Sequence, residues 1–138
     1  KYLDNPLLVK GRKFDLRVYS FIASIDPLIV YYRDGKARIS LAKYNKTSND
    51  RSEHLTNTAV SADIIKYCTE NNATYDGMNV QELKALQNIF FEDFQQLLIK
   101  EGIVTDQNWL KNFLRPQLKK ISYHYLKMSQ PNLRKLPQ

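Results

Sequence analysis

Residues 13–17 read Lys-Phe-Asp-Leu-Arg, and this alternation of charged and apolar side chains strongly limits what the segment can form. Successive side chains of an extended strand point to opposite faces. Lys13, Asp15 and Arg17 would therefore share one face, while the apolar residues between them cover a core on the other. Such a strand either carries a site on its charged face or is a charged edge strand that resists aggregation.

The flanking residues extend this pattern into several strands. Residues 14–24 are rich in aromatic and β-branched side chains, which favours a strand, and residues 28–33 favour a second one. Asp26-Pro27 and Asp34-Gly35 are turn signals, and the alternation over residues 37–41 predicts a third strand. The sequence therefore predicts a meander of two consecutive hairpins.

The second half of the chain shows helical spacing instead. Residues 45–53 and 69–79 are polar and predict loops, and we assign no element to residues 58–68. One helix is expected over residues 80–101, ended by Gly102, on the spacing of Leu83, Leu86, Phe90, Phe94 and Leu97. Strands followed by helices indicate an α+β fold.

A second helix is expected over residues 106–129. Its apolar stripe comprises Leu110, Leu114, Leu118, Ile121, Tyr125 and Met128. Pro116 should kink or divide this helix because proline removes a backbone donor and clashes with the preceding turn. Pro131 and Pro137 predict an extended exit.

Composition and charge narrow the classes of partner. The net charge of +7 is distributed as +5 over residues 1–57, −4 over 58–103 and +6 over 104–138. Basic segments favour anionic partners, although a solvated basic surface is at least as common. The single Cys68 excludes an internal disulfide and is expected to be a small buried filler. No apolar run approaches the ~18–20 residues that span a bilayer, so no membrane partner is expected.

Four blocks occur in an order and at a spacing that are far more specific than any block alone. They are residues 1–8 (Lys-Tyr-Leu-Asp-Asn-Pro-Leu-Leu), 11–19 (Gly-Arg-Lys-Phe-Asp-Leu-Arg-Val-Tyr), 32–38 (Tyr-Arg-Asp-Gly-Lys-Ala-Arg) and 54–57 (His-Leu-Thr-Asn). In these blocks the chain closely resembles the tubulin–tyrosine ligase-like family, which consists of ATP-grasp ligases that add amino acids to tubulin. The resemblance covers residues 1–57 and is much weaker over 58–138.

The resemblance implies antiparallel strands of an ATP-grasp-like domain followed by a helical insertion. Residues 1–57 would be the strand segment with the nucleotide site, and residues 58–138 the mainly helical part of the same domain. The expected nucleotide-binding residues are Lys1, Tyr2 and Leu3 beside the adenine, Lys13 and Asp15, and the pair Thr56 and Asn57. Arg38 corresponds to the arginine that pairs with the carboxylate of the incoming amino acid, and Arg17 would help to hold substrate.

The chain departs from the family in two places. Thr58-Ala59 follows Asn57 where the family often has a hydrogen-bonding side chain, so the amino acid that is added, whether glutamate, glycine or tyrosine, is left open. The family also needs magnesium, held by an Asp and a Glu-x-Asn motif further along the chain. These ligands are expected beyond residue 138, so we expect a fragment that is inactive alone and that supplies no metal ligand.

Three functions follow from these observations. The first is part of an ATP- and magnesium-dependent ligase that acts on the acidic tails of tubulin with a free amino acid, in the cytoplasm and cytoskeleton, including the cilium or axoneme. The second is a catalytically inactive, ligase-like structural protein of ciliary microtubules. The third, a nucleic-acid module, rests on charge alone and lacks a motif.

We expect the aromatic residues Tyr19, Phe21, Tyr31 and Tyr32 to pack in a core, and His54 to be structural.

Overall fold

A long β-hairpin forms the centre of the computed structural model, which describes residues 2–134. The sheet has the order β1-β2-β3 and consists of β1 (Phe14–Ile25), β2 (Leu28–Ile39) and β3 (Ile89–Phe90), all antiparallel. The helices are α1 (Arg51–His54), α2 (Thr58–Glu70), α3 (Val80–Gln87), α4 (Phe91–Lys100), the π-helical turn η1 (Leu110–Leu114) and α5 (Arg115–Leu133). The predicted α+β class with antiparallel strands is confirmed.

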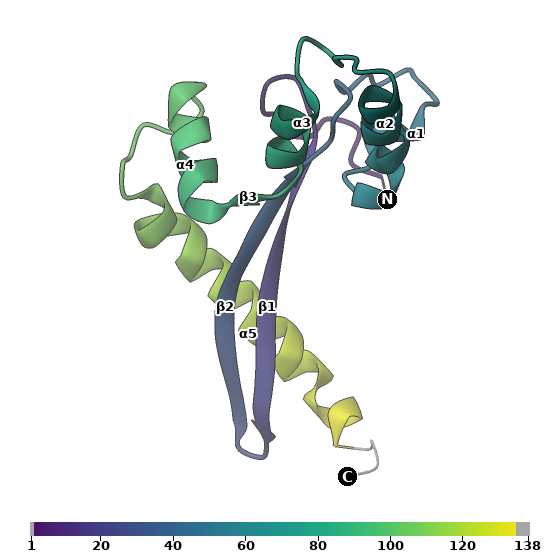
Figure 1. Ribbon diagram of the computed structural model, residues 1–138. Coiled ribbons are helices and arrows are strands. Elements are labelled where there is room, and N and C mark those ends of the chain that lie inside the picture. Colours follow the sequence, from purple (N-terminus) through teal and green to yellow (C-terminus); the bar gives the residue numbers. More distant parts are fainter. Residues whose placement is uncertain (1, 135–138) are drawn as a thin grey trace.

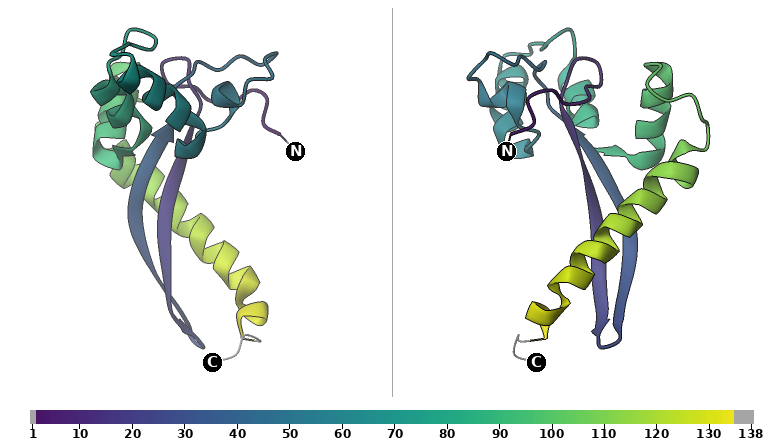
Figure 2. Two further views of the ribbon diagram at one scale, coloured as in Figure 1. Left: turned by 45° about the vertical axis from the view of Figure 1, so that its right-hand side comes forward. Right: turned by 180° about the vertical axis from the view of Figure 1, so that it is seen from behind.

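The helices lie at one end of the hairpin and along one of its sides. Helices α1 to α4 gather at the end away from the hairpin turn, and α5 runs obliquely along the strands (Figure 1). The other views show the last turns of α5 beside the tip of the hairpin (Figure 2). There, Gln130 donates a hydrogen bond to the carbonyl of Ile25 at 2.5 Å, and Arg134 pairs with Asp26 at 2.9 Å. These contacts hold α5 to the turn at Asp26-Pro27, which the sequence predicted.

The expected tight turn at Asp34-Gly35 is wrong. Strand β2 continues through both residues, so the separate strand expected over residues 37–41 is also wrong. The third strand is β3, which pairs with β2 at Lys36 and Ala37. The chain therefore forms one long hairpin and an added short strand, where the sequence predicted two short hairpins.

Asp34-Gly35 forms a β-bulge. The register between the strands shifts directly after the pair Arg17–Lys36, so that two residues of β2 lie opposite Val18 alone. A Cβ atom on Gly35 would lie 2.0 Å from the carbonyl oxygen of Arg17. Glycine is therefore needed here for the close approach of two backbones, which is its usual reason inside a strand.

The single helix expected over residues 80–101 is also wrong. Asn79 begins α3 with a capping box that includes Glu82, and the helix ends at Asn88, where φ is −143° and ψ is 80°. The two residues of β3 then add to the free edge of β2, and α4 starts a new helix. Two short helices on the same side of the sheet give the apolar spacing that resembles one long helix. Gly102, at φ +68°, follows α4 as predicted.

The remaining helical segments differ from expectation in their bounds. Helix α2 occupies residues 58–70, much of which the sequence left unassigned, and α1 interrupts the loop expected over 45–53. The run after residue 106 changes from π-helix to α-helix next to Pro116, but it is not divided there, because η1 passes directly into α5 at Arg115. Pro131 lies inside α5, so the extended exit expected there is wrong. Pro137 lies outside the part of the chain that is described.

Three buried apolar clusters hold the helices against the sheet. The largest contains Val9, Ala37, Ile39, Phe94 and Leu98, the second Leu41, Cys68 and Leu83, and the third Phe91, Leu110 and Leu114. The far half of the apolar stripe predicted for α5 is exposed, because Met128 retains 82% of its accessible surface and Tyr125 retains 70%. The core thus lies at the end of the hairpin where the charged residues of β1 are found.

The expected burial of the hairpin aromatics is wrong for three of the four residues. Tyr19, Phe21 and Tyr31 are exposed, whereas Tyr32 is half-buried with its ring near Lys119 of α5. Helix α5 contacts the sheet on the other face, so it does not cover the three exposed aromatic residues Tyr19, Phe21 and Tyr31. We call their side of the hairpin the open face; it also carries Asp15, Arg17, Lys36 and Arg38.

Candidate nucleotide and carboxylate site

Asp15, Arg38 and Thr56 meet on the open face of the hairpin. Asp15 and Arg38 are directly opposite each other in the β1–β2 register, so their side chains extend from the same side of the sheet. Arg38 donates from Nε at 2.8 Å and from Nη2 at 2.5 Å to the two carboxylate oxygens of Asp15. Thr56, in the segment before α2, donates its hydroxyl to the same carboxylate at 2.5 Å. Strand pairing therefore brings together residues far apart in the sequence.

These contacts determine the ionisation of Asp15. Partial burial by itself raises the pKa of this carboxyl, but hydrogen bonds from Arg38 and Thr56 outweigh it. The charges of Arg38 and Arg17 act in the same direction, so the pKa of Asp15 is below its usual range. The site therefore contains a carboxylate that is paired with Arg38 and that lies within the electrostatic influence of Arg17.

Lys13 lies beside this group with a different kind of partner. Its Nζ donates to the hydroxyl of Tyr2 at 3.0 Å and lies 4.4 Å from the centre of the Tyr2 ring and 5.5 Å from that of Tyr44. Within residues 2–134, Lys13 forms no ion pair with a carboxylate. Its positive charge is held in place by neutral groups and is available to an anion.

Arg17, Leu3 and Asn57, which were also predicted for the site, make no side-chain hydrogen bond to these residues in the part of the chain that the structure describes. Arg17 is exposed on the open face and is paired with Lys36 in the strand register. Leu3 is 67% exposed in the extended segment before β1. Asn57 is the N-cap residue of α2, but its side chain makes no capping hydrogen bond. Lys1 lies outside the described residues.

His54 is a member of the site that sequence reasoning took to be structural. Its Nδ1 lies 2.7 Å from the hydroxyl of Tyr2, and its Nε2 lies 2.7 Å from the carbonyl oxygen of Ser48. Its ring also meets those of Tyr2 and Tyr44 edge to face. No spacing in the sequence signals a contact between residues 2 and 54, because only the fold brings the N-terminal segment against α1.

Arg12 is a second residue that the sequence did not single out. Its side chain is 4% exposed and donates to the carbonyl of Leu41 at 3.1 Å and to the carboxylate of Asp76. Hydrogen bonds from Arg12 and Lys43 hold the pKa of Asp76 below its usual range. Arg12 thus joins the loop before α3 to the start of β1, and its role is to support the strand that carries Lys13.

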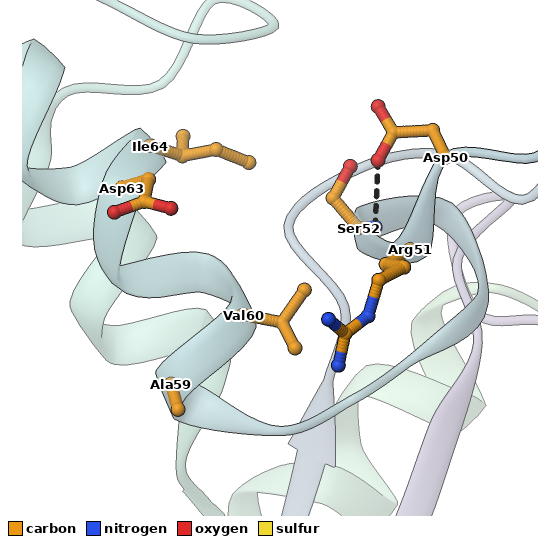
Figure 3. A pocket seen from close by; sticks show the side chains of 7 residues that line it. All are labelled: Asp50, Arg51, Ser52, Ala59, Val60, Asp63 and Ile64. Carbon is orange, nitrogen blue, oxygen red and sulfur yellow. Dashed lines mark hydrogen bonds between the residues drawn. The ribbon is translucent and has the colours of Figure 1, made fainter.

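A pocket lies between α1 and the first turns of α2. It is lined by Asp50, Arg51, Ser52, Ala59, Val60, Asp63 and Ile64, and Figure 3 shows the Arg51 side chain beside Val60. Asp50 accepts a hydrogen bond from the backbone N–H of Ser52 at its edge. None of the predicted site residues that the structure describes lines this pocket, so it is separate from the Asp15–Arg38–Thr56 group.

Three cations at a spacing of four residues, Lys111, Arg115 and Lys119, form a basic stripe along the last helical run, and this stripe is partly neutralised. Arg115 donates to Asp34 at 2.6 Å and to Glu92 at 2.5 Å, and thereby joins η1 and α5 to the bulge and to α4. Lys119 lies over the ring of Tyr32. Of the three cations in this stripe, Lys111 is the one that remains exposed without such a contact among residues 2–134. The stripe serves mainly to attach the helix to the sheet.

The described residues contain neither a cluster of metal ligands nor a membrane-spanning helix. Over residues 2–134, no three His, Cys, Asp or Glu side chains come close enough together to hold a metal ion. No helix within those residues has the length and apolar character needed to cross a bilayer. The candidate site comprises Lys13, Asp15, Arg17, Arg38, Thr56 and the aromatic residues around Lys13.

Known proteins are similar to this chain in sequence. The chain is 30% identical over 133 residues to "Inactive polyglycylase TTLL10" of Homo sapiens, covering 96% of this chain and 18% of that protein. It is 35% identical over 115 residues to "Tubulin monoglutamylase TTLL4" of Mus musculus, covering 80% of this chain and 9% of that protein. It is 34% identical over 116 residues to "Tubulin glycylase 3D" of Tetrahymena thermophila, covering 79% and 11%. No solved structure matches the chain.

The relatives and the family comparison agree. The chain spans less than a fifth of the length of each of these three relatives. The model of the tubulin-tyrosine ligase family matches residues 1–138, so the match extends well past the four blocks that end at residue 57. This chain belongs to the tubulin-tyrosine ligase family.

Proposed function

We propose that this chain forms part of an ATP-dependent ligase that adds an amino acid to tubulin. The observation that carries the proposal is the position of Lys13, a cation without a carboxylate partner among residues 2–134, beside the Asp15–Arg38–Thr56 group. A fixed, uncompensated ammonium group is suited to phosphate oxygens. The donors and acceptors of this face fit a nucleotide, which would supply the phosphoryl group that activates a carboxylate.

The residues of the site would divide into two groups. Lys13, Asp15, Thr56 and Asn57 would face the nucleotide together with Tyr2, Leu3 and Lys1. Arg17 and Arg38 would face the carboxylate of the incoming amino acid. Since Asp15 occupies the Nε and Nη2 donors of Arg38, its Nη1 donors are left for substrate, and Arg17 provides a second guanidinium.

The partners follow from the family and from charge. Tubulin is the proposed acceptor, through its acidic tails, with a free amino acid and magnesium as co-reactants. The magnesium ligands are proposed to lie beyond residue 138. The relatives include a monoglutamylase and a glycylase by name, so the proposal leaves the identity of the amino acid open. The proposed location is the cytoplasm and cytoskeleton, including the cilium.

Replacement of Lys13 tests this function. In the native protein, with whatever residues flank these 138, Lys13→Ala should abolish ATP-dependent incorporation of labelled amino acid into microtubules. Lys84→Ala, which removes an exposed lysine on α3 that makes none of the hydrogen bonds or ion pairs described for the site, is the matched control and should retain activity. Full incorporation by Lys13→Ala would refute the assigned role of this residue.

A second function is favoured by the name of one relative. The human protein that is 30% identical is called an inactive polyglycylase. The alternative is thus a ligase-like structural protein that binds ciliary microtubules without catalysis. It predicts co-sedimentation with microtubules that is unaffected by ATP and by Lys13→Ala, and no incorporation of amino acid by the unmodified protein.

A further inference from the structure

A chain of three hydrogen bonds connects Lys13 to the loop before α1. Lys13 Nζ is 3.0 Å from the Tyr2 hydroxyl, which is 2.7 Å from His54 Nδ1, and His54 Nε2 is 2.7 Å from the carbonyl oxygen of Ser48. The group at each end of this series of hydrogen bonds can act in one way only. An ammonium group can only donate, and a carbonyl oxygen can only accept.

The two fixed ends determine every proton between them. Because the Ser48 carbonyl accepts, His54 Nε2 must carry a hydrogen. Lys13 donates to one lone pair of the Tyr2 oxygen, and the hydroxyl hydrogen of Tyr2 finds its acceptor in His54 Nδ1 when that nitrogen is unprotonated. The neutral imidazole with its hydrogen on Nε2 is the form of His54 that makes all three hydrogen bonds and also gives the Tyr2 hydroxyl hydrogen an acceptor.

We propose that His54 is a positioning residue for Lys13 and that it acts only in this neutral form. His54 fixes the Tyr2 hydroxyl, and Tyr2 fixes Lys13 through its oxygen and its ring face. This proposal rests on the proposed function, in which Lys13 holds the phosphates of a nucleotide. It gives His54 a role and a protonation state that the four sequence blocks do not specify.

Protonation of His54 would break the arrangement. An imidazolium would direct a second hydrogen at the Tyr2 oxygen, which already accepts from Lys13, and the Tyr2 hydroxyl would lose its acceptor. Other ionisable groups face His54 from the neighbouring segments: Lys13 at the start of β1, Tyr44 from the loop after β2, and Asp50 at the start of α1. Because histidine side chains as a class change charge between about pH 5 and 8, comparison of ATP binding at pH 8 and pH 5.5 tests this step.

The first test observes His54 without any nucleotide. Long-range proton–nitrogen NMR spectra of histidine-labelled native protein should show His54 with its hydrogen on Nε2 at pH 8. Tyr2→Phe keeps the ring under Lys13 and removes only the hydroxyl, so the Nδ1 signal of His54 should move, while His124 on α5 serves as the reference. A hydrogen on Nδ1, or an Nδ1 signal that Tyr2→Phe does not change, would overturn the proposal.

The second test measures ATP affinity by calorimetry in the native protein. Tyr2→Phe should weaken ATP binding at pH 8 by about threefold to tenfold, the value of one neutral hydrogen bond. Tyr67→Phe, which makes the same chemical change on an exposed part of α2, is the matched control and should bind normally. Binding by the unmodified protein should weaken as the pH falls to 5.5.

His54→Asn separates positioning from mere packing. Its amide oxygen can accept from Tyr2 near the place of Nδ1 but cannot be protonated, so this variant should bind ATP at pH 8 nearly as the unmodified protein does. It should also lose the weakening at pH 5.5. A pH dependence in His54→Asn equal to that of the unmodified protein would overturn the proposal.

Lys13→Ala distinguishes failure of the proposed nucleotide site from failure of the role proposed for His54. If Lys13→Ala binds ATP as tightly as the unmodified protein, the proposed nucleotide site itself is wrong. If Lys13→Ala weakens binding while Tyr2→Phe does not, the nucleotide site stands and the role of His54 is refuted. If His54 or Tyr2 variants fail to fold, the NMR tautomer of the unmodified protein still decides the protonation state.

Discussion

Substitution of Gly35 by alanine tests the bulge that shapes the open face. The added Cβ would lie 2.0 Å from the carbonyl oxygen of Arg17 and 2.8 Å from its carbonyl carbon. Ordinary contact begins at 3.4 Å, so the two strands must separate by more than 1 Å at this point. Both obstructing atoms belong to backbone and cannot rotate away.

The cost follows from what this separation breaks. Moving β2 away from β1 beside the Arg17–Lys36 pair disrupts about two ladder hydrogen bonds, at about 1 kcal/mol each. Repacking of the half-buried residues around the bulge adds about 1 kcal/mol or more. We therefore expect Gly35→Ala to lower the free energy of unfolding by about 3 kcal/mol, measured by urea denaturation of the native protein.

A matched control separates this clash from an effect of backbone strain. Gly102 has φ +68° and nothing within 4 Å of its Cβ position, so Gly102→Ala introduces strain without a clash. Gly102→Ala should lower the free energy of unfolding by about 1 kcal/mol. Equal losses for Gly35→Ala and Gly102→Ala, or a loss below 1 kcal/mol for Gly35→Ala, would refute the reasoning.

Three further substitutions test the site and its supports. The pKa of Asp15 is lower in the folded than in the unfolded protein, so ionised Asp15 stabilises the fold above the pKa of an unfolded Asp, and this stabilisation is lost as the pH falls. Asp15→Asn should therefore make stability depend less on pH between about pH 5 and 2, measured by thermal melts at a series of pH values. Asn79→Ala removes the cap of α3 and should cost about 1 kcal/mol in urea denaturation, whereas no loss would contradict the capping box. Arg115→Met leaves Asp34 unpaired and should cost about 1–2 kcal/mol; a neutral effect would show that the ion pairs do not hold α5.

The site could be predicted in part because it lies on one strand. The period of two in residues 13–17 places Lys13, Asp15 and Arg17 on one face whatever the rest of the fold does, and the structure has them there. The partners across the sheet could not be deduced in this way. The pairing of Asp15 with Arg38 depends on a register that the bulge at Gly35 sets, and the same dipeptide reads locally as a turn.

Burial was the hardest property to predict from the sequence. Tyr19 and Phe21 have the residue types of a core, yet they are exposed because α5 covers the other face of the hairpin. Their alternation indicated a strand but could not identify which face would meet a helix. Likewise, the apolar spacing over residues 80–101 is helical throughout and does not predict that Ile89 and Phe90 pair with the free edge of β2.

The sequence by itself determined the family, the α+β order of elements and the charged face of β1, because these depend on residue types at short, fixed spacings. The tertiary structure alone decided the register of the hairpin, the break between α3 and α4, and the contact of Tyr2 with His54. These features arise from backbone pairing and packing between segments far apart in the chain. Local propensity contains no information about such distances, so they become visible only in the folded molecule.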